Sequence, residues 1–518
     1  MPSLSQPFSA MQPAYDVVVI GSGYGGGVAA ARLSQAGHKV CVIERGKEYQ
    51  PGDFPARFPE LKNALRIRGG KADLGPDTAL YDFRVGSDIH VLTGSGLGGG
   101  SLINAGVAMR PKLGNLDSSS WPQGLLNDPL LETGFQEAEK VLAPEICPAT
   151  ATLDKFNSLT NSAGILGRNA EPAAMTISFS DRRNAFGTEQ NACTLCGDCC
   201  SGCNVGAKTT VTSTYLAEAV RHGCAIFSEV QAKYFERQGT GWQLILETSG
   251  DKEFETGQKT RTLEVKNIVL AAGTLGTTEL LFRSRDKGLA LSDRLGQGFS
   301  ANGDMIAFAY DSDSEVNAIG VGHPAKLEDT KVGPFVSGLF SVSAGSGNEF
   351  LIQDGSLPSS SAPLLPLFFM ANGRILGSLQ SLIKGVYQGP IAQTEIFFIV
   401  GHDNAGGTIE LSNGKLHISW PSVQDQEIYG AIEEQLQKIA DAKGARLITN
   451  PLANTAMGRI PASTHPLGGC RMGDTLAEGV VNHKGQVFNS EGGVYNGLYA
   501  WDGSIIPTSL GVNPLLTI

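Results

Sequence analysis

A glycine-rich turn between two apolar segments near the N-terminus constrains the fold more than any other feature. Residues 16–20 (DVVVI) and 39–43 (KVCVI) each predict a short, fully buried strand of a parallel sheet. Residues 21–26 match G-x-G-x-x-G, and residues 28–36 predict a helix that ends at Gly37. This strand–loop–helix–strand order predicts a Rossmann-like α/β domain.

The same unit predicts a dinucleotide site. Gly21, Gly23 and Gly26 let the backbone turn tightly and approach a pyrophosphate at the helix N-terminus. Glu44 lies 18 residues past Gly26, at the end of the second strand, where a carboxylate accepts hydrogen bonds from a ribose diol. The loop by itself does not distinguish FAD from NAD.

The charge and hydropathy of the chain disfavour two classes of partner. The 518 residues carry a net charge of −11, which disfavours nucleic acid because phosphate binding requires a basic face. The first 30 residues contain no Lys or Arg, and no stretch reaches the roughly 20 apolar residues of a membrane span. We therefore expect a cytoplasmic protein with no transmembrane segment and no nucleic-acid partner.

The rest of the chain mixes further strands and helices. Residues 267–271 (NIVLA) predict another buried strand, and residues 428–443 predict an amphipathic helix. Between about 305 and 425 the pattern is typical of alternating strands, with a hairpin turn at residues 413–414. Residues 357–390, rich in Ser, Pro and apolar side chains, predict irregular chain that either lies near a hydrophobic substrate or is simply buried.

Four further motifs resemble those of one flavoenzyme family. They are residues 94–104 (GSGLGGGSLIN), 270–276 (LAAGTLG), 465–473 (HPLGGCRMG) and 498–507 (LYAWDGSIIP), the last followed by NPLLTI at 513–518. In this order they resemble the glucose–methanol–choline (GMC) oxidoreductases, and the second glycine loop and HPLGGC are most similar to the cholesterol oxidases. The resemblance selects FAD as the dinucleotide.

The resemblance implies a two-domain α/β architecture. A Rossmann-like FAD-binding domain with a parallel sheet is expected to combine residues 14–115, 205–304 and 450–518. A substrate-binding domain with a mainly antiparallel sheet is expected to combine residues 116–204 and 305–449.

The resemblance also implies cofactor contacts outside the first loop. The second glycine loop is expected at the isoalloxazine, the Asp-Gly pair of the fourth motif at the ribityl chain and phosphates, and the backbone after Glu229 at the adenine. The residues expected to bind FAD are Gly21, Gly23, Gly26, Glu44, Gly99, Gly100, Asn104, Val230, Ala272, Asp502 and Gly503.

Alcohol oxidation gives two polar residues of these motifs a chemical role. The reaction removes a hydroxyl proton and moves a hydride from carbon to N5 of the flavin, so it needs a base and a hydroxyl-orienting donor. His465 suits either role because its ordinary pKa lies near neutrality, and the amide of Asn513 can hydrogen-bond the substrate oxygen. The family places its catalytic pair at these two positions, which implies oxidation of a small-molecule alcohol, here a hydrophobic alcohol or sterol.

Two features depart from the cholesterol oxidases. Those enzymes carry a glutamate that moves a proton during isomerisation of the steroid double bond, and Glu395, the nearest acid, does not align cleanly with it. We therefore expect no steroid isomerase activity. The family also continues past its last motif as a helix whose positive N-terminus faces the flavin. This sequence ends at Ile518, so either it is truncated or the protein uses little of that helix.

Five of the nine cysteines lie between residues 193 and 203. Cys193, Cys196, Cys199 and Cys203 have the C-x2-C-x2-C-x3-C spacing of bacterial ferredoxins, and Cys200 is an alternative ligand. The spacing favours a [4Fe–4S] or [3Fe–4S] centre, with a zinc site or a reduced apolar group of thiols as alternatives. Electrons then leave the flavin either to O2 or through such a centre to an acceptor protein or quinone.

Two other functions stay open at this point. A lyase on the same fold keeps FAD only as structure, as the hydroxynitrile lyases of this family do, and bleaching of the flavin by an alcohol without oxygen would exclude it. An electron carrier or scaffold would not turn over an alcohol, and the pairing of His465 with Asn513 argues against that function.

Overall fold

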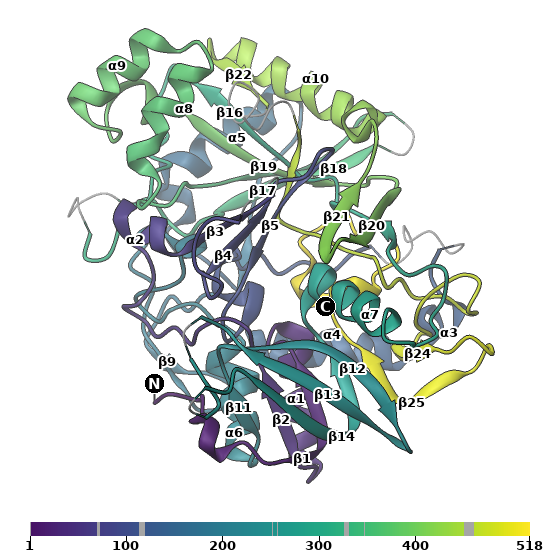
Figure 1. Ribbon diagram of the computed structural model, residues 1–518. Helices are drawn as coiled ribbons and strands as arrows, with labels where there is room; N and C mark the ends of the chain where they lie inside the picture. The colour runs from purple at the N-terminus through teal and green to yellow at the C-terminus, as the bar shows by residue number, and fades with distance from the viewer. Residues whose placement is uncertain are drawn as a thin grey trace.

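Strands from three distant parts of the chain form one sheet in the lower half of the molecule (Figure 1). The computed structural model describes residues 2–69, 73–112, 120–250, 252–255, 257–325, 331–345, 348–449 and 460–518. The parallel strands of this sheet are, in order, β11 (Ala225–Phe227), β2 (Val40–Ile43), β1 (Ala14–Ile20), β14 (Thr260–Leu270) and β25 (Val494–Ala500). The Rossmann-like sheet predicted from the first glycine loop is therefore confirmed.

Strand β14 makes both parallel and antiparallel pairings within this one sheet. Its last residues, Ile268–Leu270, lie between β1 and β25 in parallel register. Its first half instead pairs antiparallel with β13 (Gly241–Thr248), which in turn pairs with β12 (Val230–Gln238). Beyond β25 the outermost strand is β24 (Gln486–Phe488), which is antiparallel to β25.

A six-stranded antiparallel sheet forms the upper half of the molecule (Figure 1). Its strands are, in order, β22 (Arg446–Ile448), β16 (Met305–Tyr310), β19 (Glu395–Gly401), β18 (Glu349–Asp354), β17 (Gly338–Ser343) and β7 (Glu171–Pro172). Helices α5 (Asp154–Ile165) and α10 (Glu427–Ala442) pack against it, and α10 buries the apolar stripe that predicted it. The mixed fold is confirmed, whereas the exact domain boundaries stay a prediction.

Smaller sheets connect the two halves. The sheet β23–β5–β4–β3 (Ala462–Ser463, His90–Gly94, Tyr81–Arg84, Leu65–Arg68) leads from β5 into the second glycine loop and from β23 into the HPLGGC motif. The predicted hairpin is present as β20 (Gly407–Ser412) and β21 (Lys415–Ser419), extended by β15 (Gln297–Phe299). Two short pairs are β6–β8 (Glu145–Ile146, Ala174–Met175) and β9–β10 (Arg182–Arg183, Glu189–Gln190).

The remaining helices surround these sheets, and two of them correct the sequence prediction. They are α1 (Tyr24–Gln35), α2 (Phe58–Asn63), α3 (Gln123–Leu126), α4 (Leu130–Leu142), α6 (Ala217–Arg221), α7 (Gly273–Arg285), α8 (Leu365–Ala371) and α9 (Ile375–Lys384). The prediction of irregular chain over residues 357–390 is wrong, because α8 and α9 form a helical hairpin there. Pro366 stands in the first turn of α8, where proline is tolerated, and Gly373 separates the helices.

Glu395, the acid nearest in sequence to an isomerase glutamate, is part of a buried ion pair. Its carboxylate accepts hydrogen bonds from Lys443 Nζ at 2.5 Å and from Ser162 Oγ at 2.9 and 3.0 Å, and all three residues are buried. Glu395 ties β19 to α5 and to the end of α10. It is not among the residues that line the cavity described below.

Replacing Lys443 with methionine is expected to lower the free energy of unfolding by about 3–5 kcal/mol, because the Glu395 carboxylate is then buried without a cation. Lys438→Met is the matched control, since Lys438 pairs with Glu434 on the exposed face of α10. That change is expected to cost at most about 0.5 kcal/mol. Thermal melting and urea unfolding of both variants provide the comparison. Equal stability of the two variants would show that the buried pair is not structural.

Candidate active site

A cavity of about 750 Å³ lies between the parallel and antiparallel sheets and is lined by both. Of the thirteen residues predicted to bind FAD or act on substrate, twelve line it. The exception is Gly26, where an added Cβ would lie 2.3 Å from the carbonyl oxygen of Gly21. Gly26 therefore keeps α1 close beneath the loop, which is a packing role.

The first glycine loop packs closely against neighbouring backbone at Gly21 and Gly25 and is open at Gly23. A Cβ on Gly21 would lie 2.2 Å from the Ala271 carbonyl oxygen, and one on Gly25 would lie 1.8 Å from that of Trp501. Gly21 also has φ +99°, which only glycine adopts readily. In contrast, no described atom lies within 4 Å of a Cβ on Gly23. The N-terminus of α1 thus faces free space, as a pyrophosphate site requires.

Glu44 is buried at the end of β2 and is fixed by two donors. Ser22 Oγ donates to Oε2 at 2.5 Å, and the Gly46 amide donates to Oε1 at 2.8 Å. Burial raises the pKa of Glu44, against the opposing effect of these hydrogen bonds. Each carboxylate oxygen keeps a lone pair for a ribose hydroxyl.

The second glycine loop rests on the first and presents unsatisfied polar atoms. A Cβ on Gly99 would lie 2.8 Å from Cα of Gly23, so the two loops touch through glycines. Asn104 Nδ2 donates to the hydroxyl of Tyr24 at 2.8 Å. Asn104 Oδ1 and Ser95 Oγ are buried without a hydrogen-bond partner in the part of the chain that the structure describes. Buried polar atoms are normally satisfied, so both indicate a polar ligand in the cavity.

Asp502 joins the fourth motif to the N-terminus of α7. Its carboxylate accepts hydrogen bonds from the Gly273 amide at 2.9 Å, from Thr277 Oγ1 at 2.5 Å and from the Ser504 amide at 2.8 Å. Burial raises the pKa of Asp502, although these bonds oppose the shift. The side chain therefore organises this wall, and the backbone at Gly503 faces the cavity.

His465 is held by a buried carboxylate that the sequence did not reveal. Its Nδ1 lies 2.7 Å from Oδ1 of Asp304, and Asp304 Oδ2 accepts hydrogen bonds from the amides of Thr464 and His465. Burial lowers the pKa of His465, but the charge of Asp304 and its hydrogen bond outweigh that effect, and the net pKa is raised. Because Nδ1 is engaged, Nε2 is the nitrogen left for the cavity.

Asn513 is oriented in a similar way by Gln353 of β18. Gln353 Nε2 donates to Asn513 Oδ1 at 2.9 Å, and both residues are buried. The amide nitrogen of Asn513 is thereby left as a donor. Neither Asp304 nor Gln353 stands in a motif, and each reaches its partner across more than 150 residues, so the sequence carried no signal for them.

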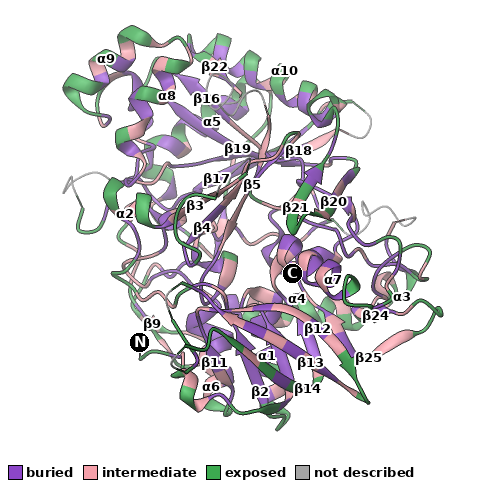
Figure 2. Cartoon of the chain, in the orientation of Figure 1, coloured by how far each residue is buried: buried purple, intermediate pink, exposed green. Residues whose placement is uncertain are grey.

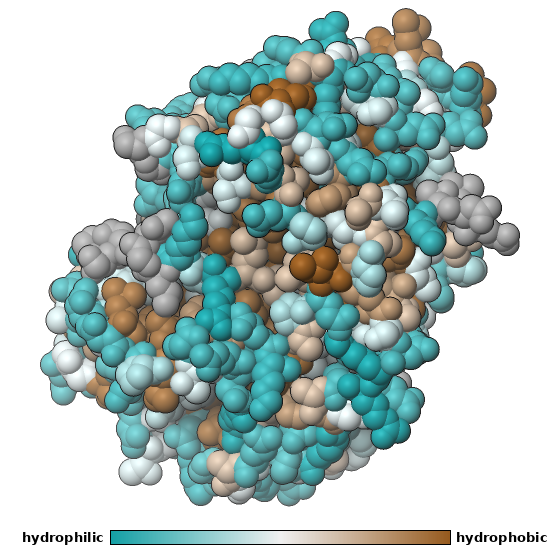
Figure 3. Space-filling model, turned by 180° about the vertical axis from the view of Figure 1, so that it is seen from behind, coloured by the Kyte–Doolittle hydropathy of each residue, from teal (hydrophilic) through white to brown (hydrophobic). Residues whose placement is uncertain are grey.

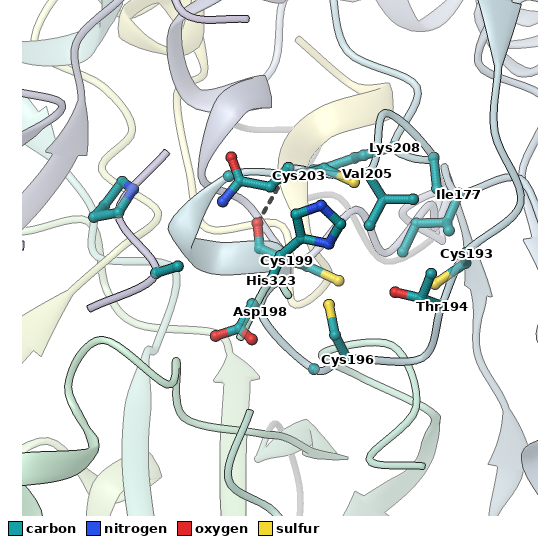
Figure 4. A pocket seen from close by; sticks show the side chains of 16 residues that line it. Ile177, Cys193, Thr194, Cys196, Asp198, Cys199, Cys203, Val205, Lys208 and His323 are labelled. Atoms are coloured by element: carbon teal, nitrogen blue, oxygen red, sulfur yellow. Dashed lines mark hydrogen bonds between the residues drawn. The ribbon is translucent and has the colours of Figure 1, made fainter. Parts of the chain in front are cut away.

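The five clustered cysteines are free thiols that lie in two places; Cys199 is buried and the other four are partly buried. Cys193, Cys196, Cys199 and Cys203 line a narrow pocket with His323 and Lys208 (Figure 4), whereas Cys200 lines the large cavity. The thiols of the narrow pocket lie beside apolar side chains such as Ile177 and Val205. Burial raises the pKa of Cys196 to about 12, and it also raises the pKa of Cys193, Cys199 and Cys200.

This arrangement does not support the predicted metal centre. Among the described residues, no group of three or more His, Cys, Asp and Glu side chains is placed to hold a metal ion. The ferredoxin spacing alone is therefore not enough to predict a metal centre. It brings four thiols to one pocket, but the thiols do not point toward a common centre. Lys208 Nζ instead donates to the carbonyl oxygens of Cys199 and Asn104, which ties the cysteine segment to the second glycine loop.

The two sheets and the cavity between them define a Rossmann-type α/β protein with a large ligand site, and comparison with known proteins identifies its family. The profiles of the GMC oxidoreductases match residues 24–300 and 422–518. The chain therefore belongs to the GMC oxidoreductase family. FAD is the cofactor expected for that family.

Individual relatives agree with this assignment. A cholesterol oxidase of Acinetobacter baumannii is 27% identical, covering 97% of this chain and 92% of its own length. One of Mycobacterium tuberculosis is 28% identical, with coverages of 98% and 90%. Long-chain-alcohol oxidase FAO1 of Arabidopsis thaliana is 24% identical over 97% of this chain and 65% of its own length.

Solved structures show the same fold at low identity. A pyridoxine 4-oxidase from Mesorbium loti superposes with a TM-score of 0.61 at 16% identity, covering 97% of each chain. A fungal aryl-alcohol oxidase superposes with a TM-score of 0.62 at 14% identity, over 98% of this chain and 97% of its own. No described helix has the length and hydropathy needed to cross a membrane. The cytoplasmic location stays a prediction.

Proposed function

We propose that the protein is an FAD-dependent oxidase of a hydrophobic alcohol, with O2 as the electron acceptor. The observation that carries this proposal is the convergence of both glycine loops, His465 and Asn513 on one cavity. The residues present fit FAD: α1 presents an open N-terminus, Glu44 is buried beside it, and Asn104 Oδ1 is an unsatisfied buried acceptor.

His465 and Asn513 handle the substrate hydroxyl in this proposal. With Nδ1 engaged by Asp304, neutral His465 accepts the hydroxyl proton at Nε2. The Asn513 amide nitrogen donates to the substrate oxygen and holds it as the negative charge develops. FAD, when bound, supplies the acceptor for the hydride.

The cavity wall supports an apolar substrate. Ile306, Phe335, Val336 and Phe398 line the part formed by the antiparallel sheet and its approaches. Relatives of the chain are named cholesterol oxidase and long-chain-alcohol oxidase. The acids of the described cavity wall are Glu44, Asp82, Glu279 and Asp502, which come from the parallel sheet, α7 and the β3–β5 sheet. With no acid among the described residues of the substrate wall, a Δ5-3-hydroxysteroid would be oxidised without migration of its double bond.

Anaerobic mixing of the FAD-loaded protein with sterols, long-chain alcohols and simple alcohols tests the proposal. Bleaching of the flavin by an apolar alcohol, followed by one peroxide per ketone or aldehyde in air, is the expected result. A flavin that stays oxidised with every alcohol would instead support a lyase. Dye-linked turnover without peroxide would support a dehydrogenase.

The thiol pocket is expected to be dispensable for this electron transfer. The double variant Cys196→Ser/Cys199→Ser should keep at least about half of the peroxide-forming rate, because reduced thiols in a packed pocket carry no electrons from the flavin. Iron and acid-labile sulfide, quantified on the wild-type sample, should be far below one per chain. Stoichiometric iron with sulfide, or loss of dye-linked turnover in the variant, would overturn this assignment.

A further inference from the structure

Helix α9 (Ile375–Lys384) carries its apolar stripe on the outside. Helices at a protein surface normally bury that stripe and expose their polar face. In α9 the buried residues are Ser378 and Ser381, whereas Leu376 is 84% and Ile383 86% exposed. Figure 2 shows the helix at the upper left edge of the molecule, largely in the colour of exposed residues. The exposed apolar side chains of the α8–α9 hairpin are Leu367, Ile375, Leu376, Leu379, Leu382 and Ile383.

The inward face of α9 carries small residues that let the helix pack closely with its leucines outward. A Cβ on Gly377 would lie 2.3 Å from the hydroxyl of Tyr310 and 3.2 Å from Pro390 Cγ. Only small residues allow so close an approach, so α9 cannot rotate to bury its leucines without a clash. The hairpin is anchored beneath by Leu365 and Phe369 of α8, which pack in the core. The outward apolar face is thus a property of the folded state.

The charge of this segment is opposite to that of the chain. Between residues 355 and 394 the charged residues are Arg374 and Lys384, both basic and one at each end of α9, while the whole chain carries −11. At physiological ionic strength charges act over about 8 Å, so Arg374 and Lys384 act on a surface that touches the hairpin. In the rear view, brown side chains gather at the upper right corner, where α9 lies (Figure 3).

The hairpin is also continuous with the cavity. Leu357, Pro358, Ser360 and Ser361, which lead into α8, line the cavity wall. The chain that leaves α9 enters β19, and Phe398 of that strand lines the cavity too. An apolar molecule delivered at the hairpin therefore meets the segment that borders the substrate space.

We propose that the α8–α9 hairpin docks the protein on a lipid surface that carries anionic headgroups. An apolar helix face flanked by basic side chains is the composition that binds in the plane of a bilayer interface. A second copy of the chain is a poorer occupant, because a ten-residue helix is about 15 Å long and about 10 Å across. That face is far smaller than the roughly 800 Å² per partner of a stable protein interface. Delivery of a lipid-borne alcohol to the cavity is the purpose of this docking, and that part rests on the proposed function.

Flotation with vesicles tests the docking independently of catalysis. The FAD-loaded wild type is expected to float with vesicles of phosphatidylcholine containing phosphatidylserine, and less with phosphatidylcholine alone. Leu376→Gln/Ile383→Gln should reduce the bound fraction about tenfold or more, because each removes an apolar side chain from the interface. Arg374→Gln/Lys384→Gln should abolish the preference for phosphatidylserine. Leu130→Gln, at an exposed leucine of α4 that lies outside the hairpin, is the matched control and should bind as the wild type does.

Two results would overturn the docking proposal. One is flotation that the Leu376/Ile383 variant does not reduce. The other is a wild type that never floats but forms an oligomer in light scattering, which the same variant dissociates, since the face would then bind a second copy. Turnover of a water-soluble alcohol should be equal in all variants. Loss of turnover throughout, with flotation intact, would count against the proposed function and not against the docking.

Discussion

Replacing His465 with alanine is expected to leave FAD bound and to slow the reduction of the flavin by alcohol about 10²–10⁴-fold, the contribution typical of a positioned general base. FAD binding should survive because both glycine loops, Glu44 and Asp502 are held by contacts that do not involve the imidazole. Stopped-flow reduction without oxygen measures the step directly, and the flavin absorbance of the purified variant measures cofactor retention.

Two further variants test whether the slower flavin reduction is due to loss of the His465 imidazole. His417→Ala removes an exposed histidine of β21 and should reduce the flavin at the wild-type rate. Asn513→Ala removes the second member of the pair and should also slow reduction, with FAD retained. An unchanged rate in the His465 variant would contradict the assignment of the base. Loss of FAD from it would show instead that the HPLGGC motif is structural.

The parts of the fold that follow from local patterns were predictable from the sequence. The run of apolar residues in β1, the glycines after it and the acid at the end of β2 lie within about thirty residues of each other, and each obeys a rule of backbone geometry. The same is true of α10, whose apolar stripe repeats at helical spacing and is buried as expected. The positions of His465 and Asn513 came from resemblance, because no local rule distinguishes a catalytic histidine from a structural one.

The parts that depend on distant contacts were not predictable. Asp304 reaches His465 from 161 residues away, and Gln353 reaches Asn513 from 160 residues away, so neither pairing leaves a pattern in the chain. The cysteine spacing is local, but the directions of the side chains are set by the packing of the surrounding loops. Helix α9 was missed because its small inward residues and outward leucines invert the usual pattern of a surface helix.

Asp304 is expected to act on the reaction through His465 alone, and the variant Asp304→Asn isolates that effect. Asparagine keeps the size of the side chain but removes the charge that holds the pKa of His465 above its ordinary value. It also weakens the hydrogen bond that leaves Nε2 free for the substrate. We expect the rate of flavin reduction at its optimum to fall about 10–100-fold, with FAD retained.

The pH dependence of Asp304→Asn gives the decisive measurement. In the wild type, His465 becomes a base only as the pH rises through its raised pKa, so the rate falls on the acidic side of that pKa. Without the charge of Asp304 the pKa of His465 falls, and the acidic limb of the rate profile should move to lower pH. Asp403→Asn is the matched control, because Asp403 is a buried carboxylate on the adjoining loop that bonds Ser300 and the Ala301 and Gly303 amides but makes no contact with His465.

The control variant should lose stability while its acidic limb stays in place, since leaving buried donors unsatisfied costs free energy without altering the charge beside the imidazole. A limb that moves in both variants would report a general loosening of the loop at residues 300–304. A limb that moves in neither would mean that His465 does not titrate in the rate-limiting step, and the proton would then have to leave the alcohol by a route that bypasses the imidazole. Movement in Asp304→Asn only is the outcome that the geometry predicts, because among the described residues Asp304 is the carboxylate within hydrogen-bonding distance of His465 Nδ1.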